Sequence, residues 1–477
     1  MDAKQPSLKK PAMAALAALG ILLIGAVVFF QERLFADTSF VAFNIINYKS
    51  LAIQNRRYGS FITQIIPFIE SKFHLRLTTI LFSYSVSFNL FFFSAALLIA
   101  IKFKQYGLTV LMALFYLLLV SESYFWDYDE LLQGITWMFL FFATILYLGK
   151  KEINKVVFSL LFFLLGFFAI SSHFITIIPT IFLWIYFIIE KKNWPFSKKM
   201  SIILSCFLVG IIALKFLISQ SKGYDDVHLH GITHFSLQDI IDSFSRPVVK
   251  IFLYRCVTNY WLAVIVFILG IVSLIRTGGK MLAWWAIISI IGYLILMGIT
   301  YASEDSNTQL CYIEIEWQSL GIIAATPFVF SYLPKLKPSI SVWLLIVIFI
   351  TRLIYIAATI PSFTWRVHFN EIVLAQMKKK GINKLAFYMD NEIRPKYKLD
   401  WAAGYESLFS SAMKGDKPQL TFCFVNKDDS QTLEILKNPK GFYDAYYSLS
   451  PENINHNYFI IDTTQPYQIM TYQELFK

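Results

Sequence analysis

The feature that most constrains this chain is a series of apolar segments separated by short polar stretches. Each segment is about 17–22 residues long, the length of an α-helix that crosses the hydrocarbon core of a bilayer. Backbone N–H and C=O groups find no partners in lipid, so such segments must be helical there. Charged residues make up only 15% of the chain, against about 25% in a typical soluble protein. The sequence therefore predicts an α-helical polytopic membrane protein.

About eleven predicted transmembrane helices account for most of residues 1–360, the predicted transmembrane domain. Their ranges are 11–30, 79–101, 106–121, 131–148, 156–171, 174–189, 200–219, 257–275, 281–301, 317–333 and 339–359. The longer polar stretches 31–78 and 220–256 are predicted external loops. We expect a tight turn around His173, because one long helix over 156–189 would move the Lys-rich segment 190–199 to the other side of the membrane.

The distribution of charge predicts the orientation of this bundle. The short loops 122–130 and 302–316 hold acidic residues and no Lys or Arg. The alternate loops are rich in cations, at Lys4, Lys9, Lys10, Lys102, Lys104, Lys150, Lys151, Lys155, Lys191, Lys192, Lys198, Lys199, Arg276, Lys280, Lys335 and Lys337. Cytoplasmic loops carry an excess of Lys and Arg. We therefore predict insertion in the inner (plasma) membrane with the N-terminus in the cytoplasm, and we attribute the net charge of +11 to topology rather than to nucleic-acid binding.

Residues 361–477 are predicted to form a small extracytoplasmic (periplasmic) α/β domain. Helical patterns at 366–380, 405–414 and 432–437 alternate with strand-like runs at 385–389, 420–425 and 458–461. Strands alternating with helices are typical of such domains. The sequence has no Gly-rich phosphate loop and no GxSxG motif in this part. We therefore expect a role in packing or acceptor docking rather than independent catalysis.

Polar residues suited to chemistry gather on the predicted outer face. They comprise the acids Asp37, Glu122, Asp127, Asp129 and Glu130 and the bases Arg56, Arg57, Arg246 and Arg255. Aromatic residues lie among them in the segment Ser121–Glu130. A carboxylate can accept hydrogen bonds from sugar hydroxyls or act as a general base. Arginines can bind phosphate through paired hydrogen bonds. The pattern favours a site for a phosphorylated sugar.

Several of these residues also have a plainer interpretation. Asp37 follows the first span and can be an interfacial helix-end residue. The acids of 122–130 can form a solvated loop, with Asp129 and Glu130 suited to a helix N-terminus. Arg56 and Arg57 can contact lipid headgroups.

Residues near or inside the predicted spans also need an explanation. His173 is either a hydrogen-bonded turn residue or a substrate contact. Arg352 lies within the last span, where a charge is costly, so we expect it to face the bundle and find a partner or a lipid phosphate. The spacing of His228, His230 and His234 permits a metal site, but loop histidines without a firm scaffold are usually not ligands.

The layout resembles the GT-C superfamily of membrane glycosyltransferases, which use polyprenyl-phosphate-linked sugars. The likeness covers nearly the whole chain and is carried by short features. They are a long first external loop with Asp37 near its start, a short acidic second loop ending in Asp129-Glu130, the hairpin Ser171–Pro179, and an outward C-terminal domain. The chain departs from the family in having Thr38, rather than a second acid, after Asp37 and His173 in place of a hairpin Lys or Arg.

The resemblance implies transfer of a hexose or pentose from a polyprenyl-phosphate donor to a glycan, lipid or protein acceptor on the outer face. It implies catalytic roles for Asp37, Asp129 and Glu130. The implied substrate contacts are Arg56, Arg57, Glu122, Asp127, His173, Arg246, Arg255 and Arg352. The leaving phosphate would be held by arginines or by a divalent ion, Mg²⁺ or Mn²⁺, at Asp127 and Asp129. No cofactor is otherwise implied, and membrane lipids are expected partners.

Other classes of function remain open at this point. A lipid-linked glycan polymerase or ligase would share the topology and the outer-face site. A transporter would show internal repeats and charges near the membrane midplane, and we find no convincing repeat. A membrane O-acyltransferase would need a buried catalytic histidine, for which His173 is a weak match. A non-catalytic membrane protein also fits the sequence.

Overall fold

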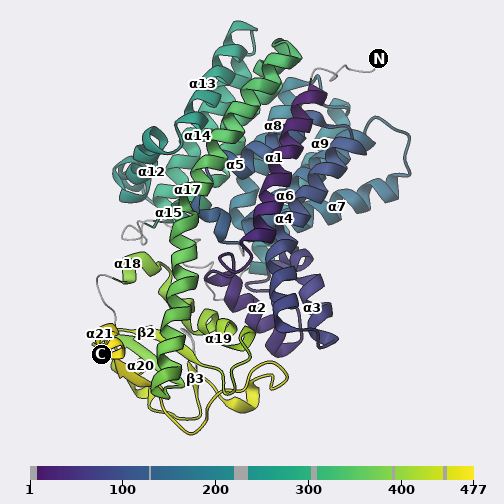
Figure 1. Ribbon diagram of the computed structural model, residues 1–477. Helices are drawn as coiled ribbons and strands as arrows, with labels where there is room; N and C mark the ends of the chain where they lie inside the picture. Colours follow the sequence, from purple (N-terminus) through teal and green to yellow (C-terminus); the bar gives the residue numbers. More distant parts are fainter. Residues whose placement is uncertain (1–7, 128–129, 220–234, 302–308, 389–392, 444–447) are drawn as a thin grey trace.

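The computed structural model describes residues 8–127, 130–219, 235–301, 309–388, 393–443 and 448–477. It is mostly helical, with a helical bundle at one end and a smaller region containing a sheet at the other (Figure 1). The described part of the chain starts at the far end of the bundle and finishes in the smaller region (Figure 1).

Seven helices of the described residues are long and apolar enough to cross a membrane. They are α1 (Lys9–Val28), α4 (Leu77–Ile101), α6 (Glu130–Leu148), α7 (Lys155–Ser172), α9 (Lys198–Ser219), α14 (Lys280–Thr300) and α17 (Pro338–Lys380). Three further predicted spans are shorter apolar helices, Tyr106–Leu118, Phe174–Glu190 and Leu320–Lys335. The remaining predicted span falls in a bent pair of helices. The chain crosses the membrane eleven times, as predicted, only if the three shorter helices and the bent pair each cross it as well.

The bent pair joins α12 (Pro247–Thr258) to α13 (Trp261–Arg276). The segment made of α11 (Leu237–Asp242) and α12 meets α13 at 84°. The predicted span 257–275 thus corresponds to α13 alone, with α12 turned away from it.

The bundle is built around α5 (Tyr106–Leu118), whose residues from Gly107 onward are all buried. A helix that is apolar on every side lies either in a protein core or in lipid, and α5 is covered by other helices. Helices α1, α4, α16 (Leu320–Pro327) and α17 pack against it. At the periphery, α9 leaves Ile202, Phe207 and Val209 exposed. Large exposed apolar surfaces of this kind are rare on soluble monomers and are usual on helices that face lipid.

The predicted turn at His173 is confirmed. Helix α7 ends at Ser172, His173 is extended, and α8 (Ile177–Glu190) follows the short 3₁₀ helix η4 (Phe174–Thr176). The ring of His173 caps that turn, because its Nδ1 accepts a hydrogen bond of 3.2 Å from the backbone N–H of Ile175.

The last helix links the bundle to the smaller region. Helix α17 continues without a break past Pro361 to Lys380 and reaches down into that region (Figure 1). The predicted domain boundary at 360/361 therefore lies inside a helix. Beyond it, β1 (Lys384–Tyr388), β2 (Thr421–Val425) and β5 (Gln468–Met470) form a parallel sheet in the order β2-β1-β5.

Helices surround this sheet. They are α18 (Arg394–Tyr397), α19 (Ala403–Met413), α20 (Ser430–Leu436) and α21 (Tyr472–Phe476). Helix α19 follows β1 and packs on β2 and α17. A separate antiparallel pair is made by β3 (Phe442–Tyr443) and β4 (Ser448–Leu449).

The prediction of a strand at 458–461 is wrong. Only an isolated bridge, Ile461 to Gln419, forms there, and β5 occupies the other edge of the sheet. The cause is the packing of Phe459, whose ring lies 5.4 Å from that of Phe43 and 5.9 Å from that of Phe409. Burial of this ring between two helices overrides the local preference for a strand.

The segment predicted as the first external loop folds against the same region. It contains α2 (Asp37–Tyr48), the 3₁₀ helix η2 (Tyr58–Gln64) and α3 (Ile65–Lys72). The ring of Phe43 contacts those of Tyr405, Phe442 and Phe459. Next to them, the Asn47 amide donates to the carbonyl of Asn453 at 2.8 Å. The loop and the C-terminal region thus form one layer at the end of the bundle (Figure 1).

Candidate functional site

The two predicted external loops that carry the acids are joined by a buried arginine. Arg33, just past α1, is 1% exposed. Its guanidinium forms an ion pair with Asp127 and donates to the side-chain oxygen of Asn89 and the carbonyl of Tyr124. Leu34, the next residue, forms an antiparallel bridge with Trp126. Arg33 therefore fixes the segment that leads to Asp37 against the second loop.

Asp37 is the first residue of α2 and lies where the two predicted external loops meet. We call this place the Asp37 junction. The indole Nε1–H of Trp126 donates to its Oδ2 at 2.9 Å. The carboxyl group is partly buried, and this burial, followed by the negative charge of Glu130, raises its pKa to about 7. The hydrogen bond from Trp126 and the charge of Arg57 act in the opposite direction. A carboxyl group with this pKa can gain and lose a proton near neutral pH.

Glu130 and Arg57 form the second ion pair of the site. Glu130 opens α6, where the positive end of the helix dipole favours a carboxylate. Its Oε2 accepts a hydrogen bond of 2.8 Å from Nη1 of Arg57, and both side chains are buried. The structure thus brings together Asp37, Arg57 and Glu130 from three separate parts of the sequence. Asp129, predicted beside them, lies outside the described residues.

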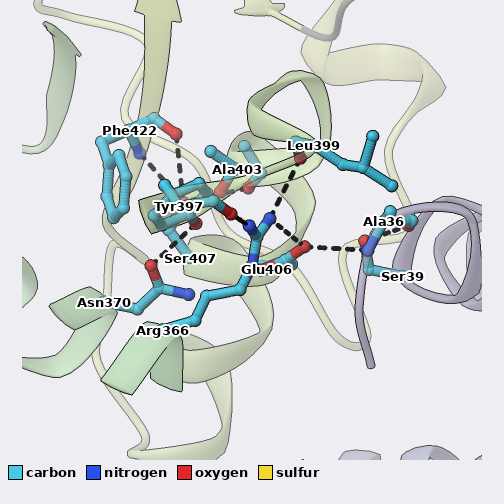
Figure 2. A network of polar contacts seen from close by, with 11 residues as sticks. Ala36, Ser39, Arg366, Asn370, Tyr397, Leu399, Ala403, Glu406, Ser407 and Phe422 are labelled. Carbon is cyan, nitrogen blue, oxygen red and sulfur yellow. Dashed lines mark hydrogen bonds and ion pairs between the residues drawn. The ribbon is translucent and has the colours of Figure 1, made fainter. Parts of the chain in front are cut away.

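A group of polar contacts around Arg366 and Glu406, here called the clamp, holds the backbone just before Asp37 (Figure 2). The backbone N–H of Ala36 donates to Oε1 of Glu406 at 3.0 Å. Arg366 binds both oxygens of Glu406, through Nε at 2.6 Å and Nη2 at 2.7 Å. It also donates to the carbonyls of Tyr397 and Leu399. Ala36 has a φ of +51°, which is strained for a residue with a Cβ, so the surrounding contacts must hold it there.

Glu122, a predicted substrate contact, is paired with the C-terminal region. Its carboxylate lies 2.7 Å from Nζ of Lys398, and both side chains are largely covered. Nearby, the buried Glu314 accepts from the backbone N–H of Ser123 at 2.7 Å and from the hydroxyls of Ser121 and Tyr260. These contacts stabilise the second loop in addition to those of Arg33.

The other predicted substrate contacts have partners outside the Asp37 junction. Arg56 donates to the carbonyl of Ile218 at the end of α9. Arg246 lies 3.6 Å from Asp239, and Arg255 donates to the side chain of Asn259 at 3.2 Å. His173 caps its turn, in agreement with the plainer interpretation of that residue.

Arg352 is fully buried and holds backbone carbonyls rather than a carboxylate. Its Nε donates to Leu117 at 3.0 Å and its Nη2 to Val120 at 2.8 Å, both at the end of α5. Its Nη1 donates to Asn259, at the break between α12 and α13. The partial negative charge of a helix C-terminus favours a cation there.

The described residues do not fit a divalent ion at Asp127. One oxygen of this carboxylate is paired with Arg33 and the other accepts a hydrogen bond of 3.3 Å from Ser85. Among the residues that the structure describes, no group of three or more His, Cys, Asp or Glu side chains could hold a metal ion. His228, His230 and His234 lie outside the described residues.

Sequence reasoning missed the residues that hold the site together. Arg33, Arg366 and Glu406 are the clearest cases, since none belongs to a recognisable motif. One signal was present for Arg33, a cation just past the end of the first span that is predicted to face outward, where the positive-inside rule disfavours a cation. Such an exception points to a residue retained for a specific contact.

Comparisons with protein-family models, with curated proteins and with solved structures found no match in any of the three.

Proposed function

We propose that this chain is a multi-pass membrane glycosyltransferase that moves a sugar from a polyprenyl-phosphate donor to an acceptor hydroxyl on the outer face. The observation that carries the proposal is the carboxyl group of Asp37, with a pKa of about 7, beside Trp126 at the junction of two loops. Trp126 is itself buried against the rings of Phe35 and Tyr312, so its indole fixes the position of the carboxyl group. A carboxylate with this pKa is matched to general-base catalysis near neutral pH.

In the proposed reaction, Asp37 accepts the proton of the acceptor hydroxyl as that oxygen bonds to the anomeric carbon of the sugar. The bond between this carbon and the phosphate oxygen breaks, and the phosphate leaves with the bonding electrons. Arg56, which is exposed and next to Arg57 in the sequence, is the candidate for binding the leaving phosphate. Its guanidinium would exchange the hydrogen bond to the carbonyl of Ile218 for two hydrogen bonds to the phosphate. The proton on Asp37 then returns to water.

The membrane arrangement is part of the same proposal. Eleven crossings would place the cation-rich loops in the cytoplasm and the Asp37 junction, with the C-terminal region, outside. Seven apolar helices, together with the exposed apolar side chains of α9, support membrane integration.

Purified protein in liposomes tests the reaction. One set of liposomes contains polyprenyl-phosphate-linked hexoses and pentoses with labelled sugars, and a second contains a polyprenyl-diphosphate-linked oligosaccharide. Both are supplied with cell-envelope glycans and lipids as acceptors. We expect label to move from a monophosphate donor. Transfer only from the diphosphate donor would instead indicate the polymerase or ligase class, and an absence of transfer from both would contradict the proposal.

The pH dependence of transfer provides a separate prediction. Because Asp37 must be ionised to accept a proton, the rate should rise as the pH increases through about 7. Glu130→Gln removes a negative charge that raises this pKa, so the midpoint should move to lower pH. Trp126→Phe removes a hydrogen bond that lowers the pKa, so the midpoint should move to higher pH. Identical midpoints in wild type and both variants would show that Asp37 does not control the profile.

A further inference from the structure

Helices α11 and α12 leave one apolar surface uncovered. On α12 the exposed Val257 lies four residues after the exposed Leu253 and three after the exposed Tyr254, so the three side chains form one stripe along the helix. Val257 is 76% exposed and Tyr254 is 64% exposed. Helix α11 adds Leu237 and Ile241, which are exposed as well. A soluble surface rarely carries so many large apolar side chains together, so this surface needs an apolar partner.

The opposite face of α12 fixes the helix in place. Val248, Val249 and Phe252 are buried, and the ring of Phe252 stacks on that of Trp317 at a centroid distance of 4.1 Å. Because this buried face of α12 is packed on the bundle, the helix cannot rotate to bury the stripe. The stripe therefore points away from the bundle.

The direction of α12 follows from the break at Asn259 and Tyr260. The segment meets α13 at 84°, so if α13 crosses the membrane, α12 lies nearly in the membrane plane. The break is held from inside the bundle. Arg352 donates to the carbonyl of Asn259, and the hydroxyl of Tyr260 donates to Glu314 at 3.1 Å.

The charges and aromatic rings around the stripe fit a lipid surface. Lys250 belongs to the same stripe and is exposed, and a long cationic side chain can reach from an apolar face to lipid phosphates. Tyr254 and Trp261, the first residue of α13, are partly or largely exposed. Such rings concentrate at membrane–water interfaces.

We propose that α11 and α12 form an interfacial element that lies on the membrane, with the stripe in the outer part of the acyl chains and Lys250 at the lipid phosphates. The partner is the lipid leaflet on the side of the C-terminal region. Helices with this pattern sit about 5–10 Å into the boundary between headgroups and acyl chains. The proposal depends on membrane integration but not on sugar transfer.

Depth-dependent fluorescence quenching tests this placement in the full-length protein. Cys206 and Cys256, the two cysteines that are not buried, are first replaced by alanine. An environment-sensitive dye is then attached at Val257→Cys. Matched labels go on α9, at Val209→Cys, and in the C-terminal region, at Ile435→Cys, both of which are exposed positions. The labelled proteins are placed in phosphatidylcholine–phosphatidylglycerol liposomes containing lipids that carry a quencher near the headgroup or near the chain end.

We expect the dye at Val257→Cys to emit at shorter wavelength than the dye at Ile435→Cys. It should be quenched more by the shallow quencher than by the deep one. The dye at Val209→Cys should be quenched more by the deep quencher. A dye at Val257→Cys that matches the one at Ile435→Cys would overturn the proposal. So would an unquenched dye whose blue shift is lost on dilution of the protein in the liposomes, because a second copy of the chain would then cover the stripe.

Discussion

Asp37→Asn is expected to lower the rate of sugar transfer by about 10²–10⁴-fold, the usual contribution of a general base. The amide has nearly the same shape as the carboxylate, and its oxygen can still accept the hydrogen bond from Trp126. The amide cannot, however, take up the proton of the acceptor hydroxyl. Because burial makes the ionised form of Asp37 costly, the neutral amide should fold at least as well as the wild type. The measurement is the initial rate of transfer in liposomes, with the melting temperature of the same preparation.

Glu32→Gln is the matched control for this variant. Glu32 lies five positions earlier in the same loop, is partly exposed, and accepts a hydrogen bond of 3.3 Å from Thr364. The change is the same in chemistry, from carboxylate to amide. We expect transfer to stay near the wild-type rate. Equal transfer rates for Asp37→Asn and the wild type would show that Asp37 is not the general base, regardless of the rate of Glu32→Gln.

Glu406→Ala is expected to lower the free energy of unfolding by about 3–5 kcal/mol, the usual result of breaking a buried ion pair. Arg366 is 4% exposed, and its charge would lose both carboxylate oxygens while remaining buried. The N–H of Ala36 would lose its acceptor too. Denaturant titration followed by tryptophan fluorescence measures the loss, since Trp365 and Trp401 lie next to the clamp in the sequence.

Glu434→Ala is the control for the Glu406 variant. Glu434 forms an ion pair of 2.6 Å with Lys437, a distance like that of the buried pair, but both side chains are about 70% exposed. Exposed pairs contribute about 0–1 kcal/mol. Similar losses in the two variants would mean that burial does not determine the contribution of the Arg366–Glu406 pair. The double variant Arg366→Met with Glu406→Leu should lose less than Glu406→Ala, because no unpaired charge is left inside.

The helical part of the fold could be predicted because its signals are local. Apolar segments show where helices form, and the Lys-rich segment 190–199 was enough to place the turn at His173. The strand predicted at 458–461 failed because the burial of Phe459 depends on rings of α2 and α19, which are far away in the sequence. The bend between α12 and α13 likewise depends on distant groups, among them Arg352.

The candidate site was predicted in part. The sequence drew attention to Asp37, Arg57 and Glu130 as polar residues of outer loops, and the structure places them together. The ion pairs that position them could not be predicted, since Arg33 is 94 positions from Asp127 and Arg366 is 40 positions from Glu406. No local pattern specifies such partners. Only the folded chain determines which buried charges meet.

The proposed site is tested by an experimental structure of the protein in a lipid bilayer with a non-hydrolysable polyprenyl-phosphate-sugar analogue. We expect the sugar next to Asp37, with its anomeric carbon close enough to the carboxylate for a hydroxyl to bridge them, about 3–5 Å. The lipid chain should enter from the leaflet on the side of the C-terminal region. An analogue bound in the bundle or at the cation-rich end, with the Asp37 junction empty, would contradict the central claim.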